Sequence, residues 1–100
     1  MLTTKQRAFL KKKAHSLDAM VRIGKEGYSE NTMQGITDVI KSRELIKVKI
    51  LQNCETDKYE IGEKIALGTE SEVVGIIGRT IILYKENKEN PMISLELKKV

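Results

Sequence analysis

The chain has 100 residues, a formal charge of +4 and only four aromatic side chains, none of them tryptophan. This length allows one domain with a single modest core and excludes a second folded domain, and so few rings exclude extensive stacking of nucleic-acid bases. The charge is uneven, because residues 1–25 hold seven basic and one acidic side chain and the rest hold eleven basic and thirteen acidic ones. This asymmetry predicts a polyanionic partner that approaches one side of the molecule.

Cysteine content and hydropathy set further bounds. Cys54 is the single cysteine, so the chain can form no internal disulfide, zinc knuckle or redox pair. No apolar stretch reaches the length of a membrane span, and none follows the first basic residues as a secretion signal requires. We therefore expect a cytoplasmic monomer without a metal, a cofactor, a membrane or a small-molecule substrate.

A first helix is predicted to begin near Thr3, because Thr3 and Gln6 have the spacing of a capping box. Leu10, Ala14 and Leu17 recur at helical spacing and mark the face expected to pack on the core. Four residues fall on roughly the opposite arc of this helix: Lys5, Lys11, Lys12 and His15.

This arc of cations has two interpretations. A run such as Lys11, Lys12 and Lys13 is a solvated helix face in most proteins, but no acidic residue precedes Asp18, so contact with a polyanion is favoured. His15 could act as a catalyst only with an orienting carboxylate such as that of Asp18. A hydrogen-bonding or phosphate-contacting role is favoured for it.

Residues 20–23 form a short β-prone run that ends at Gly24-Lys25-Glu26-Gly27. Ser29 is a good N-cap for a second helix that runs to about Arg43, and Tyr28 can pack on Met33 as a hydrophobic staple. The loop of residues 24–27, the GxxG loop hereafter, therefore lies between a strand and a helix N-terminus.

Backbone amides at such a junction lack internal partners and face a positive helix dipole, which makes a site for anions. Gly24 and Gly27 remove the β-carbons that would hold a phosphate away, and Lys25 adds a positive charge. Arg22 lies just upstream and could point to either side of the strand. A GxxG pattern can also be a plain turn, but the neighbouring helix cap and cationic helix favour phosphate contact.

Residues 45–51 alternate as a strand with Ile46, Val48 and Ile50 on one face and Lys47 and Lys49 on the other. The lysine face is either exposed or covered by a helix. A third helix should follow, with Thr56 or Asp57 as its cap and Gly68 at its end.

Two apolar runs, residues 73–77 and 80–84, flank Gly78 and Arg79, which predicts a hairpin with a type II′ turn. Arg79 either keeps this turn soluble or reaches the same ligand as the GxxG loop. Residues 86–91 form a polar linker, and residues 92–97 either add an edge strand or lie along the surface. The predicted order is αβαβαββ, a two-layer α/β fold with a mixed four-stranded sheet.

Four blocks of sequence resemble the YhbY-like proteins of bacteria, whose fold is the CRM domain. The first two blocks are Leu2 to Arg7 with Leu10, Lys11, Ala14, His15 and Leu17, and Ile23 to Gly27. The other two are Glu44 to Val48, and Gly78 to Lys85. The resemblance spans residues 1–85, and no function is carried onto residues 86–100. One departure is Tyr28-Ser29, where the family favours leucine and threonine, so Tyr28 could act as a staple or offer its ring to a base.

The resemblance implies a fold similar to the C-terminal domain of translation initiation factor three. It also implies RNA binding through the GxxG loop and nearby basic residues, and action on precursors of the large ribosomal subunit. The alternative is an adaptor that docks its basic face on an acidic protein. An RNA-processing enzyme is disfavoured, because the chain has no paired carboxylates with metal spacing, no activated nucleophile and no Walker-type loop.

Overall fold

The computed structural model describes residues 2–100, and its first element, helix α1 (Thr4–Ala14), begins where the capping box predicts. Thr3 Oγ1 accepts a hydrogen bond from the Gln6 amide at 3.1 Å, and Gln6 Oε1 accepts one from the Thr3 amide at 3.0 Å. Leu10 and Ala14 are fully buried. The expectation for Leu17 is wrong, because the helix ends at Ala14 and Leu17 lies 38% exposed in the linker that follows.

The remaining elements follow the predicted order αβαβαββ, with one short helix added at the end. They are β1 (Val21–Ile23), α2 (Glu30–Arg43), β2 (Leu45–Ile50), α3 (Lys58–Thr69), β3 (Glu72–Ile77), β4 (Thr80–Tyr84) and α4 (Ile93–Leu97). The sheet has strand order β1-β2-β4-β3, with β1 parallel to β2 and the other neighbours antiparallel. The α/β fold with a mixed four-stranded sheet is therefore confirmed.

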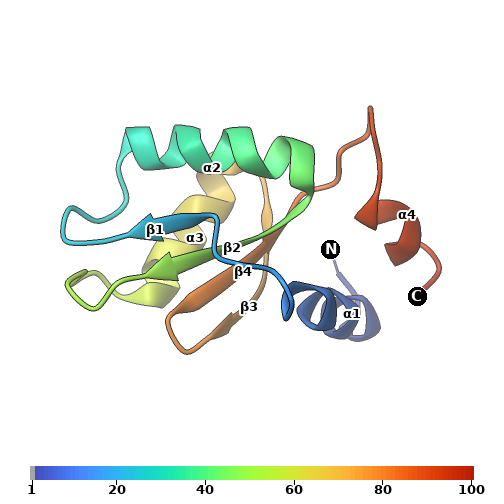
Figure 1. The fold of residues 1–100 in the computed structure, drawn as a ribbon, viewed down its shortest axis with the longest axis horizontal. Coiled ribbons are helices and arrows are strands. Elements are labelled where there is room, and N and C mark those ends of the chain that lie inside the picture. The colour runs from blue at the N-terminus through green and yellow to red at the C-terminus, as the bar shows by residue number, and fades with distance from the viewer. Residues whose placement is uncertain (1) are drawn as a thin grey trace.

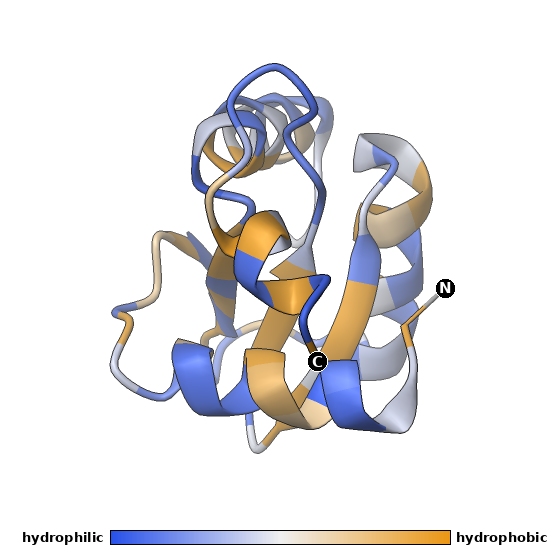
Figure 2. Ribbon diagram, turned by 90° about the vertical axis from the view of Figure 1, so that its right-hand side faces the viewer, coloured by the Kyte–Doolittle hydropathy of each residue, from blue (hydrophilic) through white to orange (hydrophobic). Residues whose placement is uncertain are grey.

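Strand alternation divides the core between the two faces of the sheet. Ile46, Val48 and Ile50 of β2 point to α2 and α3, which form the helical layer over one whole face. Leu45 points to the other face, where it packs with Leu10 of α1 and neighbouring residues. Figure 1 shows α2 along one side of the sheet and α1 on the other side, near one end. Figure 2 looks at that end, where the C-terminal helix α4 lies in front of the apolar strands, between α2 above and α1 below.

Turn and cap chemistry explains where the later elements end. Asp57 is the N-cap of α3 and accepts from the Tyr59 and Glu60 amides, both at 3.1 Å. Gly78 has φ +60°, as the type II′ turn between β3 and β4 requires. The predicted helix end at Gly68 is wrong, because α3 continues to Thr69.

Gly68 has a packing role in place of a capping role. A β-carbon there would lie 2.8 Å from Met33 Sδ and 3.1 Å from the Tyr28 hydroxyl oxygen. Glycine at this position therefore allows α3 to approach the first turn of α2 and the residue that precedes its cap. The contact also explains why α3 has glycine at position 68, where a residue with a higher helix propensity would clash.

The C-terminal segment forms helix α4, so the possible edge strand at residues 92–97 is wrong. Glu44 at the end of α2 holds this segment: its carboxylate accepts from the amides of Asn87 at 2.8 Å, Met92 at 2.9 Å and Ser94 at 3.2 Å. Those amides are committed to Glu44, and β3 already fills the edge beside β4. Leu97 then completes the core on the α1 side of the sheet.

Arg7 anchors α1 to the sheet. Its Nη1 donates to the carbonyl oxygens of Val73 at 2.6 Å and Val74 at 2.8 Å, where β3 carries a register shift between Val73 and Gly75. We expect Arg7→Gln to lower the free energy of unfolding by about 1–3 kcal/mol in denaturant titrations, because two partly buried carbonyls lose a charged donor. Lys5→Gln, at an exposed position of the same helix, is the matched control. Equal stability of the two variants would contradict the anchoring role.

Candidate nucleic-acid interface

The GxxG loop is a closed turn that directly follows β1. The Gly27 amide donates to the Gly24 carbonyl oxygen at 3.0 Å, and Gly27 has φ +72°. Within residues 2–100, the amides of Lys25 and Glu26 donate to no protein acceptor. The loop therefore presents two free donors at its tip, while the Gly27 amide is used inside the turn.

The two glycines have different physical roles. Gly27 is required by its positive φ, a region that residues with a β-carbon seldom adopt. At Gly24 the space is tight but not closed, because a β-carbon there would lie 3.3 Å from Oδ1 of the exposed Asn53 side chain and 3.4 Å from Leu51 Cδ1. The expectation that both glycines clear space for a ligand stays a prediction, and at Gly24 a β-carbon would also approach the loop after β2.

The helix N-terminus lies close behind this loop. Ser29 is the N-cap of α2, as predicted, and accepts from the Thr32 amide at 3.3 Å. The Tyr28 hydroxyl is buried beside Gly68 and has no hydrogen-bond partner among residues 2–100, and this burial raises the pKa of Tyr28. Of the two roles left open for Tyr28, the structure supports packing next to Met33, because the hydroxyl end of its ring is turned into the protein.

Three loops meet at the end of the sheet that carries the GxxG loop. They are the GxxG loop itself, the loop of residues 51–57 and the β3–β4 turn, all at the left of Figure 1. Arg79 in the β3–β4 turn is exposed, and its Nη1 donates to the Leu51 carbonyl oxygen at 3.3 Å. Arg79 therefore contacts the loop of residues 51–57, which lies next to the GxxG loop.

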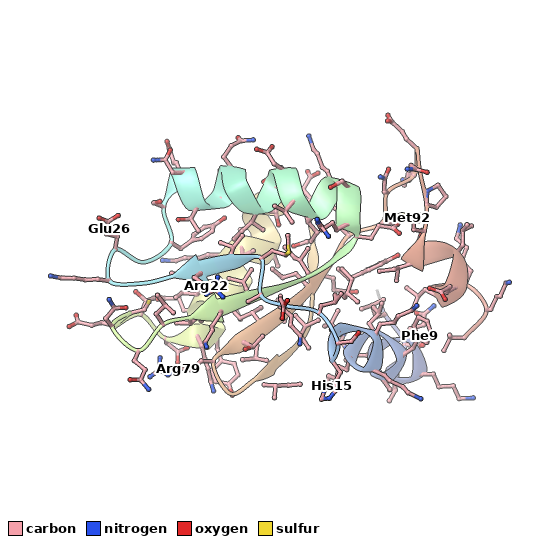
Figure 3. The ribbon with its side chains drawn as sticks, in the orientation of Figure 1. Phe9, His15, Arg22, Glu26, Arg79 and Met92 are labelled. Carbon is pink, nitrogen blue, oxygen red and sulfur yellow. The ribbon has the colours of Figure 1, made fainter. Side chains whose placement is uncertain are left out.

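Arg22 and Glu26 point to opposite sides of the sheet, as Figure 3 shows. Arg22 lies on the same side as His15 and Arg79, away from α2, and Glu26 projects from the loop toward the α2 side. Strand pairing sets Arg22 opposite Lys49, and both side chains are exposed. The acidic side chain of the loop is thereby separated from the basic side chains.

The four cations expected on one arc of α1 separate into two groups, and Lys13, outside that arc, forms a third. Lys11 and His15 face the sheet and line a shallow pocket of about 150 Å³ with Lys47, Ile77, Thr80 and Ile82. Lys5 and Lys12 are exposed and lie seven residues apart, so both project away from the sheet on the outer side of the helix. Lys13 pairs with Glu96 of α4, Nζ to Oε2 at 2.9 Å.

Lys49 adds a positive charge to the exposed face of the sheet, and the sequence alone did not decide whether this residue is exposed or covered by a helix. The alternation in β2 shows that Lys47 and Lys49 share a face, but the coverage of that face depends on where α1 ends. Lys47 lies beneath the linker after α1 and donates to the carbonyl oxygens of His15 at 3.4 Å and Leu17 at 3.0 Å. Lys49 lies beyond the linker and is exposed.

The electrostatic setting favours an anion on this side. Lys13–Glu96 is the one ion pair found within residues 2–100, so Arg22, Lys25 and Lys49 have no acidic partner there. In the same range, no three potential ligands gather as a metal site would need. None of the helices in the described chain combines the length and apolar character needed to cross a membrane.

This geometry defines the class of the protein. It is a small α/β domain with a basic sheet face and a glycine-bounded loop at one end of the sheet. The CRS1 / YhbY (CRM) domain family matches residues 2–85, and the chain belongs to that family. The match includes α1, the GxxG loop and the β3–β4 turn, and it ends before the segment that Glu44 holds.

Relatives of similar length support the assignment. The chain is 48% identical over 95 residues to the Bacillus subtilis protein named Probable RNA-binding protein YqeI, covering 95% of this chain and 99% of that one. It is 35% identical over 88 residues to a Haemophilus influenzae protein named RNA-binding protein, covering 88% and 89% of the two chains. The solution structure of a Staphylococcus aureus protein, described as an RNA-binding candidate, superposes with a TM-score of 0.74 at 45% identity. That match covers 92% of this chain and 99% of the other.

Proposed function

We propose that the protein binds structured RNA without catalysing a reaction, and that it acts in the cytoplasm as a monomer during assembly of the large ribosomal subunit. The names of the relatives support RNA as the ligand, and the family resemblance supports the large-subunit precursor. The observation that carries the proposal is a set of free amides and unpaired cations gathered at one end and on one side of the sheet.

In this proposal the amides of Lys25 and Glu26 donate to phosphate oxygens, and the Lys25 ammonium neutralises the same group. The nearby N-terminus of α2 adds a favourable dipole. Arg22, Arg79, Lys11 and His15 extend the contact along the backbone, while Lys5 and Lys12 attract the polyanion from the outer side of α1. Each neutralised phosphate releases condensed counterions, so affinity should fall steeply as salt is raised.

Two nearly isosteric substitutions test the role of the loop. Gly27→Asn and Gly27→Asp both place a short polar side chain at φ +72°, and asparagine and aspartate both tolerate this region. Only aspartate adds a negative charge beside the bound phosphate. We expect Gly27→Asp to bind large-subunit ribosomal RNA about tenfold more weakly than Gly27→Asn in filter-binding titrations at fixed salt.

Equal affinity of these two variants, with native circular dichroism for both, would contradict the role of the loop. The adaptor alternative is separated by passing cell extract over the immobilised protein before and after ribonuclease digestion. Loss of the retained material on digestion supports RNA as the ligand. Proteins that stay bound after complete digestion would support the adaptor.

A further inference from the structure

The α1 side of the sheet has one covered end and one open end. Leu10 and Ala14 of α1 cover Leu45, Val74 and Ile82. Beyond α1, one row of residues crosses all four strands in register, and we call it the open sheet face: Arg22, Lys49, Thr80 and Ile77. Arg22, Lys49 and Ile77 are exposed, Ile77 to 59%. No helix of the described chain covers this row.

Charge along this row opposes stability. Arg22 and Lys49 are direct neighbours on adjacent strands, which lie about 4.8 Å apart. Like charges this close repel each other, and no carboxylate within residues 2–100 pairs with either one. Repulsion between two unpaired cations in the unbound protein is expected at a surface where a bound polyanion neutralises both charges.

Lys11 extends this positive surface from the edge of α1. A β-carbon at Gly75 would lie 2.6 Å from Lys11 Cε and 3.3 Å from its Nζ, so the lysine stem crosses the sheet directly above Gly75. The Lys11 ammonium is thereby held beside Thr80 and Ile77, in the shallow pocket that His15 also lines. The open sheet face and the rim of α1 are therefore continuous.

This surface contains no aromatic ring. Phe9 and Tyr84 are partly buried against the core on the α1 side, and Tyr28 packs into the core on the opposite side. Tyr59 is 59% exposed, but it belongs to α3, which packs on the other face of the sheet. Proteins that hold single strands stack bases on aromatic side chains, whereas double-helical RNA is bound by shape, phosphate and 2′-hydroxyl contacts.

We propose that the ligand of this surface is double-helical RNA, gripped on two sides. The amides of the GxxG loop hold phosphates of one strand at the end of the sheet. Arg22, Lys49 and Lys11 hold phosphates across the groove, and the Thr80 hydroxyl is placed among them for a 2′-hydroxyl. The inference rests on the proposed RNA binding and adds the form of RNA that is bound.

The test compares four ligands of one mixed sequence of about 16 base pairs, the length that a small duplex-binding domain spans. They are the RNA duplex, its two separated strands and the DNA duplex, titrated at equal salt by fluorescence anisotropy. The RNA duplex should bind at least about tenfold more tightly than either strand or the DNA duplex, because DNA matches its charge but lacks A-form shape and 2′-hydroxyls.

A paired substitution locates the contact. Arg22→Gln with Lys49→Gln should lower affinity for the RNA duplex about tenfold, through the loss of two phosphate contacts. The matched control is Lys41→Gln with Lys64→Gln, which removes the same charge from exposed positions of α2 and α3 and should change affinity less than twofold. Circular dichroism establishes that both proteins are folded.

Three results would overturn the inference while leaving RNA binding itself in place. In the first, the single strands bind as tightly as the RNA duplex. In the second, the DNA duplex binds as tightly as the RNA duplex. In the third, the affinity for the RNA duplex is unchanged when Arg22 and Lys49 are both replaced by glutamine. Failure of the native protein to bind any of the RNA forms, or large-subunit ribosomal RNA, would overturn the proposed function as well. The two failures are thus distinguishable within one set of titrations.

Discussion

Glu44→Gln is expected to lower the free energy of unfolding by about 2–3 kcal/mol, the largest loss that we anticipate from one isosteric change. Glu44 is fully buried, and its carboxylate accepts from three backbone amides of residues 87–94. Glutamine has one acceptor oxygen, and its amide group would face donors. The C-terminal segment should then detach, which hydrogen exchange at Met92 and Ser94 would record.

The same carboxylate should make stability depend on pH in the acid range. Burial alone would raise the pKa of Glu44, but the hydrogen bonds from Asn87, Ser94 and Met92 outweigh it and hold the pKa below its ordinary value of 4.5. A depressed pKa in the folded state gives stability that is present above the ordinary value and is lost as the pH falls through the folded value. The stability difference between native protein and Glu44→Gln should therefore shrink on acidification.

Glu89→Gln is the matched control for Glu44→Gln, because it removes a carboxylate from an exposed position of the same C-terminal segment. Its free energy of unfolding should stay within about 0.5 kcal/mol of that of the native protein. If Glu44→Gln and Glu89→Gln are equally stable at neutral pH, the carboxylate does not hold the segment.

Neutralising four cations together should reduce RNA affinity more than about a hundredfold at moderate salt. The four residues are Arg22, Lys25, Lys49 and Arg79, which are exposed at the GxxG loop, the open sheet face and the β3–β4 turn. If each makes one phosphate contact, the slope of log affinity against log salt should fall by about three to four units. Both quantities come from titrations at several salt concentrations.

A second variant with the same net charge separates a local effect from a general one. Glutamine replaces four exposed lysines of α2, α3 and the C-terminal region: Lys41, Lys64, Lys88 and Lys99. This control should keep most of the affinity and nearly all of the salt slope. Equal losses in the two variants would mean that net charge alone, and no particular surface, attracts the RNA.

Local chemistry in the sequence was sufficient to predict the elements that lead to the site. Thr3 with Gln6, Ser29 and Asp57 marked three helix starts because a cap is satisfied within three residues. Alternation in β2 gave the buried face, and Gly78 gave the hairpin turn. The GxxG loop was found for the same reason, since its position between a strand and a cap is a local property.

Contacts between distant segments account for what the sequence did not predict. Helix α4 depends on Glu44, and the limited space beside Gly24 depends on Asn53 in another loop. Contact with a polyanion was expected for the run of Lys11 to Lys13 because no acidic residue precedes Asp18, but Lys13 pairs with Glu96, which lies near the other end of the chain. Exposure of Lys49 depends on how far α1 and its linker extend over the sheet, which spacing alone cannot give.

If RNA lies on the GxxG loop and the open sheet face, amide chemical-shift mapping with a bound RNA duplex will record the contact residue by residue. We expect the largest shifts at Lys25 and Glu26, with a second group at Arg22, Lys49 and Thr80. Shifts confined to the outer surfaces of α2 and α3, with the amides of Lys25 and Glu26 unchanged at saturation, would contradict it.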